Sequence, residues 1–132
     1  MQRQVVEHRA KGRCEYCRAP QDISAYTFHV EHIVPRSKGG ADRLSNGALS
    51  CWSCNSAKAD HRTGIDPNTG QEEPLFHPRR QRWQEHFALS TDRLHVVGRT
   101  PVGRATVERL RMNDPRFQPK ARELWMAAGR WP

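Results

Sequence analysis

The sequence has no long hydrophobic run and little apolar character overall. No segment approaches the roughly 18 consecutive apolar residues that a transmembrane helix requires. The first residues, MQRQVVEHRA, also lack the apolar stretch of a secretory signal. The mean hydropathy is −0.90, and hydrophobic residues make up 36% of the 132 positions. We therefore expect a soluble, cytoplasmic protein of one domain, or two small ones, whose modest core would benefit from a bound metal.

Acidic residues are too few to balance the basic ones. The chain has 22 Lys and Arg against 14 Asp and Glu, which gives a formal net charge of +8. The basic excess is spread over both halves of the chain and is not confined to a tail. Inside a cell, the commonest polyanionic partner of such a protein is nucleic acid. The alternative is a basic surface that serves solubility alone.

Cysteine is rare and strictly arranged. All four cysteines fall into two C-x-x-C pairs, Cys14 with Cys17 and Cys51 with Cys54. Each pair can present two thiolates on one side of a tight turn, so two pairs complete a tetrahedral zinc site. Two disulfides or a redox motif are the alternatives. An intracellular location, and the lack of a βαβ pattern around either pair, favour structural zinc.

The segment between the two pairs is longer than the about 15 to 20 residues of a simple zinc finger, so it has structure of its own. Residues 27–35 are rich in β-branched and aromatic side chains and end in proline, which predicts a strand. A second short strand is expected from Asn46 to Ser50, and a helix from Trp52 to Asp60. The sequence thus predicts two strands and a helix joined by one zinc ion.

Several of these residues form a known motif. The run E-H-I-V-P-R-S-K-G-G at 31–40, Asn46, and the run C-W-S-C-N-S-A-K at 51–58 together resemble the HNH endonuclease motif, a ββα-metal fold that cuts nucleic acid. Asn46 follows His32 by fourteen positions and Asn55 follows Asn46 by nine, as in the HNH domains of RNA-guided nucleases. The flanking C-x-x-C pairs match the zinc-bearing HNH subgroup. Downstream pieces such as G-I-D-P-x-T-G and W-x-E-H-F resemble prokaryotic HNH-signature proteins, so the likeness covers nearly the whole chain.

The resemblance implies catalytic roles. It places the general base at His32, whose unperturbed pKa of roughly 6.5 lets the imidazole accept a proton near neutral pH. It places a catalytic divalent ion, Mg²⁺ or Mn²⁺, at Glu31 and Asn55, which offer the hard oxygen ligands that such ions prefer. His29 is a further candidate ligand of that ion. Asn46 is the central residue of the motif, whose side-chain amide holds a loop and so orients the base.

Three basic residues close to the motif are candidates for contacts with nucleic-acid phosphates: Arg36, Lys38 and Lys58. Each residue of the motif also has a structural interpretation. Glu31 is then an ion-pair partner, Asn55 a helix cap, and the basic side chains a solvated surface.

Residues 61–132 are expected to form a mainly helical, basic extension packed on a nuclease core of residues 1–60. We predict an ordered loop from Gly64 to Pro74, and a helix that starts at Pro78 and includes Trp83 and Phe87. A short strand ended by Gly98 and a helix capped by Thr100 follow.

A last helix is expected to bury an apolar stripe made of Phe117, Ala121, Leu124, Trp125 and Ala128. The polar faces of this part of the chain are rich in arginine, which would suit phosphate contacts along a duplex or a plain solvated surface. These arginines are Arg79, Arg80, Arg82, Arg99, Arg104, Arg109, Arg111 and Arg122.

The sequence therefore predicts an α+β HNH endonuclease with one structural zinc and one catalytic divalent ion. Its substrate would be DNA, most simply double-stranded, and the protein would meet it at the nucleoid. The sequence leaves the oligomeric state open between a monomer and a dimer. One alternative is a non-catalytic, zinc-stapled DNA-binding module with the same fold. Another is a zinc deaminase, because His29-Val30-Glu31 followed by Cys51-x-x-Cys54 imitates the deaminase signature. That interpretation leaves Cys14 and Cys17 without a role.

Overall fold

The computed structural model describes residues 1–132 as five α-helices and three two-stranded antiparallel sheets. The N-terminal half contains α1 (Arg3–Arg9), β1 (His29–His32), β2 (Gly47–Ser50) and α2 (Trp52–Lys58), with 3₁₀ turns at Arg36–Lys38 and Leu44–Asn46. The C-terminal half contains β3 (Thr63–Ile65), β4 (Glu72–Pro74), α3 (Trp83–His86), β5 (Phe87–Leu89), β6 (Val96–Gly98), α4 (Pro101–Arg109) and α5 (Gln118–Ala127).

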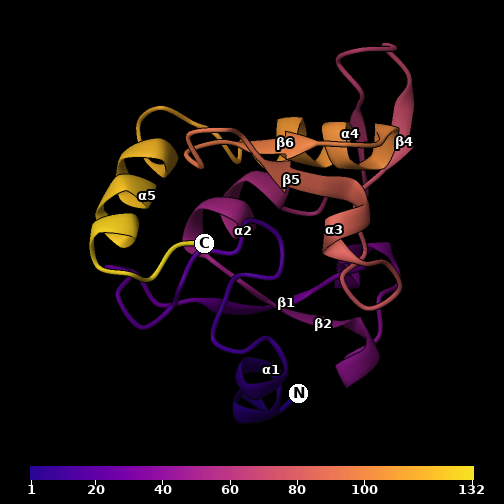
Figure 1. The fold of residues 1–132 in the computed structure, drawn as a ribbon. Helices are drawn as coiled ribbons and strands as arrows, with labels where there is room; N and C mark the ends of the chain where they lie inside the picture. The colour runs from indigo at the N-terminus through magenta and orange to yellow at the C-terminus, as the bar shows by residue number, and fades with distance from the viewer.

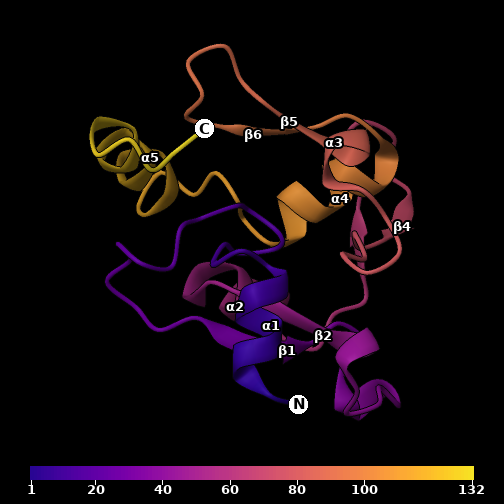
Figure 2. The ribbon, with the colours of Figure 1, turned by 60° about the horizontal axis from the view of Figure 1, so that its bottom comes forward.

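The two strands and the helix expected between and after the cysteine pairs are confirmed. Strand β1 pairs antiparallel with β2, with Glu31 opposite Ala48 and His32 opposite Gly47. Helix α2 follows β2 directly and lies against the β1–β2 hairpin (Figures 1 and 2). The N-terminal half is therefore a ββα unit, and its class, α+β, is the one predicted.

One hydrophobic core joins the two halves of the chain. Val6, Phe28 and Leu49 from the first half belong to the same buried cluster as Phe76 and Leu110 from the second. The indole N–H of Trp83 donates to the carbonyl of Tyr16 at 2.7 Å, which adds a polar link between the halves. The C-terminal part therefore packs on the ββα unit, with α4 and the β3–β4 and β5–β6 hairpins on one side of α2 (Figure 2).

The C-terminal half has more β-structure than the sequence predicted. The segment from Gly64 to Pro74, predicted as an ordered loop, is part of the β3–β4 hairpin, closed by a turn in which buried Asp66 accepts from the backbone N–H of Asn68. The predicted helix through Phe87 was also wrong, because α3 spans only Trp83–His86. Phe87 instead begins β5, and its ring packs edge-on against Phe76, with 5.1 Å between centroids. Tertiary contacts thus override local helix propensity here.

The cap of α4 is as predicted. Thr100 lies at the N-cap, Pro101 occupies the first turn, and the backbone N–H of Gly103 donates to the Thr100 hydroxyl at 3.0 Å. Such a cap satisfies one of the donors that a helix start leaves unpaired.

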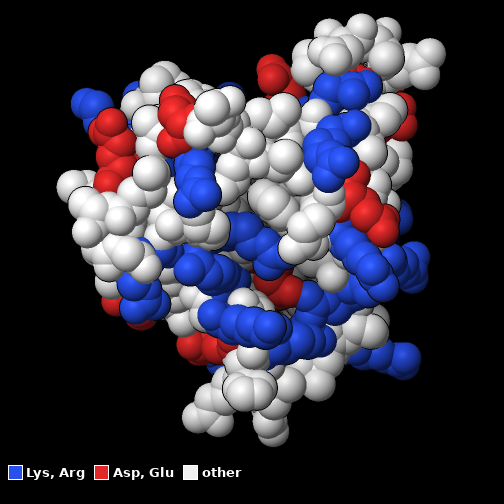
Figure 3. Space-filling view, viewed as in Figure 1, with Lys and Arg blue, Asp and Glu red and all other residues white.

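Several of the predicted surface arginines hold the fold together instead of facing solvent. Arg104 makes a bidentate pair with buried Asp66, with N to O distances of 2.9 and 2.8 Å. Arg79 pairs with buried Glu15. Lys and Arg side chains also form a band across the face drawn in Figure 3, in the region of β1 and β2. The basic residues are therefore divided between ion pairs within the fold and an exposed basic surface.

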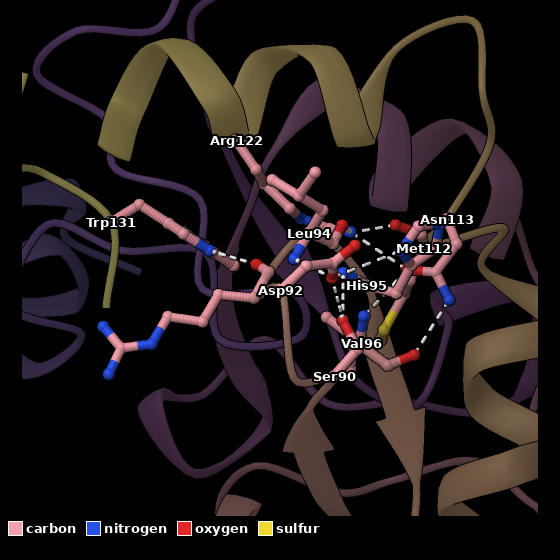
Figure 4. Close-up of polar contacts among 10 residues, drawn as sticks. Ser90, Asp92, Leu94, His95, Val96, Met112, Asn113, Arg122 and Trp131 are labelled. Atoms are coloured by element: carbon pink, nitrogen blue, oxygen red, sulfur yellow. Dashed lines mark hydrogen bonds and ion pairs between the residues drawn. The ribbon is translucent and has the colours of Figure 1, made fainter. Parts of the chain in front are cut away.

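Helix α5 exposes most of the stripe that was expected to be buried. Leu124 is 72% exposed and Phe117 is 41% exposed, whereas Gln118 and Arg122 are the buried residues of the helix. The physical reason is the guanidinium of Arg122, which donates to the carbonyls of Leu94 at 2.7 Å and Met112 at 2.6 Å (Figure 4). It also donates to the Asn113 side chain at 2.9 Å. Arg122 thus anchors α5 to two connecting segments.

We predict that Arg122→Ala lowers the free energy of unfolding by at least about 2 kcal/mol, because hydrogen bonds of a charged group are lost and buried carbonyls lose their donors. Urea unfolding followed by circular dichroism measures the change. Arg82→Ala is the matched control, since Arg82 is exposed and makes no side-chain hydrogen bond, and its effect should stay within about 0.5 kcal/mol. Equal effects of the two substitutions would contradict the anchoring role.

Candidate functional site

The four cysteines form a buried cluster. Their Sγ atoms all lie within 4.8 Å of one another, and none is in a disulfide. The Sγ atoms of Cys17 and Cys51, one from each pair, are 3.6 Å apart. A tetrahedral site with zinc to sulfur bonds of about 2.3 Å separates its sulfurs by roughly 3.8 Å. The cluster therefore has the size and donor set of a structural zinc site.

Each cysteine pair is shaped by its own backbone. The N–H of Cys17 donates to Cys14 Sγ at 3.5 Å, and the N–H of Cys54 donates to Cys51 Sγ at 3.4 Å. The second bond is also the N-cap of α2. Cys51 therefore belongs both to the cysteine cluster and to the start of this helix. The cluster leaves out His29, which is exposed, so the zinc deaminase arrangement is not formed.

The N-terminal segment that carries the first cysteine pair is hydrogen-bonded to β2. The backbone N–H of Glu15 donates to the carbonyl of Leu49, and the N–H of Leu49 donates to the Glu15 carboxylate, both at 2.9 Å. Leu49 in turn pairs with Val30 of β1. These contacts therefore fix the first cysteine pair relative to both strands of the sheet.

We predict that Cys14→Ser loses both the zinc and the cooperative fold of residues 1–60, since the energy of binding a structural zinc is folding energy. Zinc content by atomic absorption and the near-ultraviolet circular dichroism spectrum measure the two effects. Ser53→Ala, next to the second pair but outside the cluster, should keep full zinc content. A well-folded, zinc-free Cys14→Ser protein would show that the cluster does not hold the fold.

Glu31 points into the protein. It is 8% exposed, and its Oε1 accepts from the hydroxyl of Tyr16 while its Oε2 lies 3.1 Å from the Lys58 ammonium. Burial raises the pKa of Glu31, and the charge of Lys58 and the Tyr16 hydrogen bond act in the opposite direction. Burial, with Glu31 nearby, also raises the pKa of Tyr16 well above its usual value. The carboxylate is thus held inside a buried, charge-balanced group.

Lys58 is not on the surface. It is 2% exposed, and besides Glu31 it donates to the carbonyls of Ile33 at 3.0 Å and His32 at 3.4 Å. This position departs from the predicted phosphate contact, because the ammonium is enclosed by its protein partners. Lys58 instead joins α2 to the end of β1 through the carbonyls of His32 and Ile33.

His32 lies on the other face of β1 and is partly open to solvent. Its Nε2 is 3.1 Å from Oδ1 of Asp42, a residue that the sequence analysis missed. This hydrogen bond, with the nearby N-terminal charge, holds the pKa of Asp42 below its usual range. The His32 Nδ1 atom makes no hydrogen bond within the protein. No spacing pattern in the sequence pointed to Asp42, since the loop that brings it back to β1 is irregular.

Asn46 closes that loop. Its side-chain oxygen accepts from the Val34 N–H at 2.8 Å, and its amide nitrogen donates to the carbonyls of Val34 at 3.0 Å and Ala41 at 2.9 Å. Gly40 allows the close approach, because a Cβ atom there would lie 1.7 Å from the Val34 oxygen. The loop from residue 33 to residue 42 is thereby held in place, and Asp42 at its end lies beside His32, the last residue of β1.

The remaining candidates are more loosely placed. Asn55 is half-buried in the middle of α2, not at its cap, and its side-chain amide makes no hydrogen bond within the protein. Arg36 and Lys38 are exposed in the turn that follows Pro35. His29 is exposed at the start of β1, and no cluster of three or more His, Cys, Asp or Glu ligands forms apart from the four cysteines.

The donor types of Asn55 and Glu31 suit a hard divalent ion, which prefers amide and carboxylate oxygens. Asn55 is free to act as a ligand. Glu31 is free only when Lys58 releases its Oε2 atom, because the ammonium already balances that carboxylate. A divalent ion at these two residues would therefore compete with Lys58 for Glu31.

The paired strands β1 and β2, the helix α2 and the four-cysteine cluster form a ββα unit with a structural zinc site, and His32 lies at the end of β1. Residues 14–61 match the family model described as HNH endonuclease. The chain therefore contains an HNH endonuclease domain at these residues, and this family implies a nucleic-acid substrate. No curated protein and no solved structure matches the chain in the other two comparisons. No helix of the protein is long and apolar enough to cross a membrane.

We predict that Lys58→Met lowers the free energy of unfolding by roughly 3 to 5 kcal/mol, because it leaves the buried Glu31 carboxylate without its counter-charge. The double variant Glu31→Gln/Lys58→Met should recover most of this loss, since no buried charge is left unpaired. Urea unfolding of the two single variants and the double variant gives the coupling energy. Additive losses in the double variant would show that the pair does not act as a unit.

Proposed function

We propose that the protein is a metal-dependent endonuclease that hydrolyses phosphodiester bonds in DNA. The observation that carries the proposal is the position of His32 inside the matched HNH region: partly exposed, hydrogen-bonded to Asp42, and beside the loop pinned by Asn46. Such a group has the geometry of a general base that acts on a water molecule at the surface.

His32 is assigned the role of general base. With its Nε2–H donating to the Asp42 carboxylate, the imidazole keeps the tautomer in which Nδ1 accepts a proton from water. The carboxylate also stabilises the imidazolium that then forms, as an acidic partner does in other His-based catalysts. Asn46 acts on the loop and not on the substrate, so it is a positioning residue.

The divalent ion is assigned to Asn55 and Glu31. Bound there, Mg²⁺ or Mn²⁺ would offset the negative charge that develops on the phosphate and on the leaving oxygen. In the protein alone, Lys58 supplies the positive charge next to Glu31. His29 stays a further candidate ligand of the ion, because it lies two residues before Glu31 on β1 and is exposed.

Contacts with DNA phosphates are assigned to Arg36 and Lys38, which are exposed in the turn after β1. The band of basic side chains in Figure 3 adds a wider surface for the duplex backbone. Contacts of this kind position a duplex without reading its sequence. Lys58 is left out of this set because it is buried.

The experiment that tests the proposal is cleavage of supercoiled plasmid by the purified protein with Mg²⁺ or Mn²⁺ at low salt. The salt is kept low because phosphate contacts weaken steeply as ions are added. We expect nicked or linear product that depends on the added ion. His32→Ala should slow cleavage by about 100-fold or more while plasmid binding is unchanged, since a general base contributes about 10²- to 10⁴-fold.

His95→Ala is the matched control, because His95 is an exposed histidine that also neighbours a carboxylate, that of Asp92, at 3.9 Å. It should cleave at the wild-type rate. Undiminished cleavage by His32→Ala would remove His32 from the base role.

A non-catalytic DNA-binding module is the second candidate. The observation that favours it is the Glu31–Lys58 pair, which occupies a carboxylate that the ion would need. Tight plasmid binding by the wild-type protein without cleavage in either metal would support this function over the nuclease.

A further inference from the structure

Three exposed aromatic residues form a continuous surface, which we call the aromatic shelf: Tyr26, Trp52 and Phe117. The Tyr26 ring stacks on the Trp52 ring, with 5.3 Å between centroids and 24° between planes. Phe117 meets Trp52 edge-on at 5.7 Å. Tyr26 is 61% exposed, so the stack is open on the solvent side. Residues from three distant parts of the chain thus build one aromatic surface.

The shelf borders two adjoining depressions. One is an apolar groove of about 330 Å³, which is also lined by Leu124 and Trp125 of α5. The other is a more polar trough of about 670 Å³, whose lining includes Arg109 and Arg111. Both depressions share Trp52, Phe117, Ser53 and Arg116. An extended polymer bound in the trough would therefore reach the rings of the shelf.

The charges of the trough suit a polyanion. Arg116 is paired with Asp114 at 2.9 Å, and its guanidinium also lies 5.3 Å from the centre of the Phe117 ring. Arg109 and Arg111 have no carboxylate partner, and Glu108 is the one unpaired acid in the lining. The trough thus keeps an excess of one positive charge beside partly exposed aromatic rings.

We infer that the aromatic shelf and the trough bind a short single-stranded stretch of DNA, with bases stacked on the rings and phosphates near Arg109 and Arg111. Aromatic rings accept any base by stacking, and arginines that follow the backbone complete the usual design of a single-strand site. The choice of DNA as the strand rests on the proposed function. The inference adds that the substrate contains unpaired nucleotides.

The position of the shelf on α2 relates it to the candidate active site. Trp52 lies in the first turn of α2 and Asn55 follows three positions later, about one helical turn along. A single strand held on the shelf would therefore run beside the helix that carries a candidate ligand of the divalent ion.

A second copy of the chain is a poorer occupant of this surface. Symmetric pairing would place the same arginines of the trough opposite one another, in a protein whose net charge is already +8. Like charges facing each other across an interface are unfavourable. A single strand of DNA supplies the opposite charge as well as flat rings.

The test is fluorescence anisotropy of a labelled oligothymidine of about 12 nucleotides, within the range of single-strand site sizes. The full-length protein is used at low salt without added divalent ions. Tyr26→Leu and Phe117→Leu keep apolar bulk but remove the flat ring, so each should weaken binding at least about 5-fold. Tyr26→Phe keeps the ring and should bind within about 2-fold of the wild type, because stacking uses the π-face.

Val97→Ala is the matched control, an exposed apolar residue outside the shelf, and its affinity should be unchanged. Unchanged oligothymidine binding by both Leu variants would overturn the inference. A dimer seen by sedimentation in the wild type and lost in Phe117→Leu would also overturn it and assign the shelf to a second copy.

These outcomes are separate from those of the plasmid assay. Oligothymidine binding that depends on the shelf, without plasmid cleavage, would keep the inference and contradict the nuclease. Plasmid cleavage that depends on His32, with shelf variants that bind oligothymidine normally, would support the nuclease and contradict the inference about the shelf.

Discussion

The four-cysteine cluster is the constraint on which the rest of the structure depends. It brings two turns that are far apart in the sequence to within the dimensions of one zinc site, and one of these turns is also the start of α2. Through Glu15 and Leu49, the other turn is hydrogen-bonded to β2. A chain of 132 residues with a modest core thereby gains a fixed relation between hairpin and helix. The candidate catalytic residues lie on those two elements.

On β1, the face on which a polar side chain lies decides whether it is buried or exposed. Glu31 points inward, where Tyr16 and Lys58 bind its two oxygens. His32 points outward, where Asp42 binds one ring nitrogen. Alternation of side chains along a strand separates the two neighbours. The buried group joins β1 to α2, and the exposed pair is the proposed general-base site.

Sequence alone predicted the ββα unit, the cysteine cluster and the capped helix α4, because each depends on local spacing or on residue types with one dominant use. It did not predict the buried state of Lys58, which depends on how α2 packs on β1, or the partner of His32, which depends on how a loop returns to β1. Helix α5 shows the same limit. Its apolar stripe suggested an inward face, but the buried guanidinium of Arg122 turns the helix so that Leu124 and Phe117 face solvent. Long-range hydrogen bonds, which leave no periodic signal, decided these cases.

The most direct test of the account is the rate of plasmid nicking as a function of zinc occupancy, measured on one preparation with Mg²⁺ or Mn²⁺ in excess. If the zinc cluster positions the catalytic face of an endonuclease, the rate should rise in proportion to the fraction of chains that hold zinc and vanish in zinc-free protein. Full nicking activity in zinc-free, folded protein would contradict the account. So would the absence of nicking at full zinc occupancy with either ion.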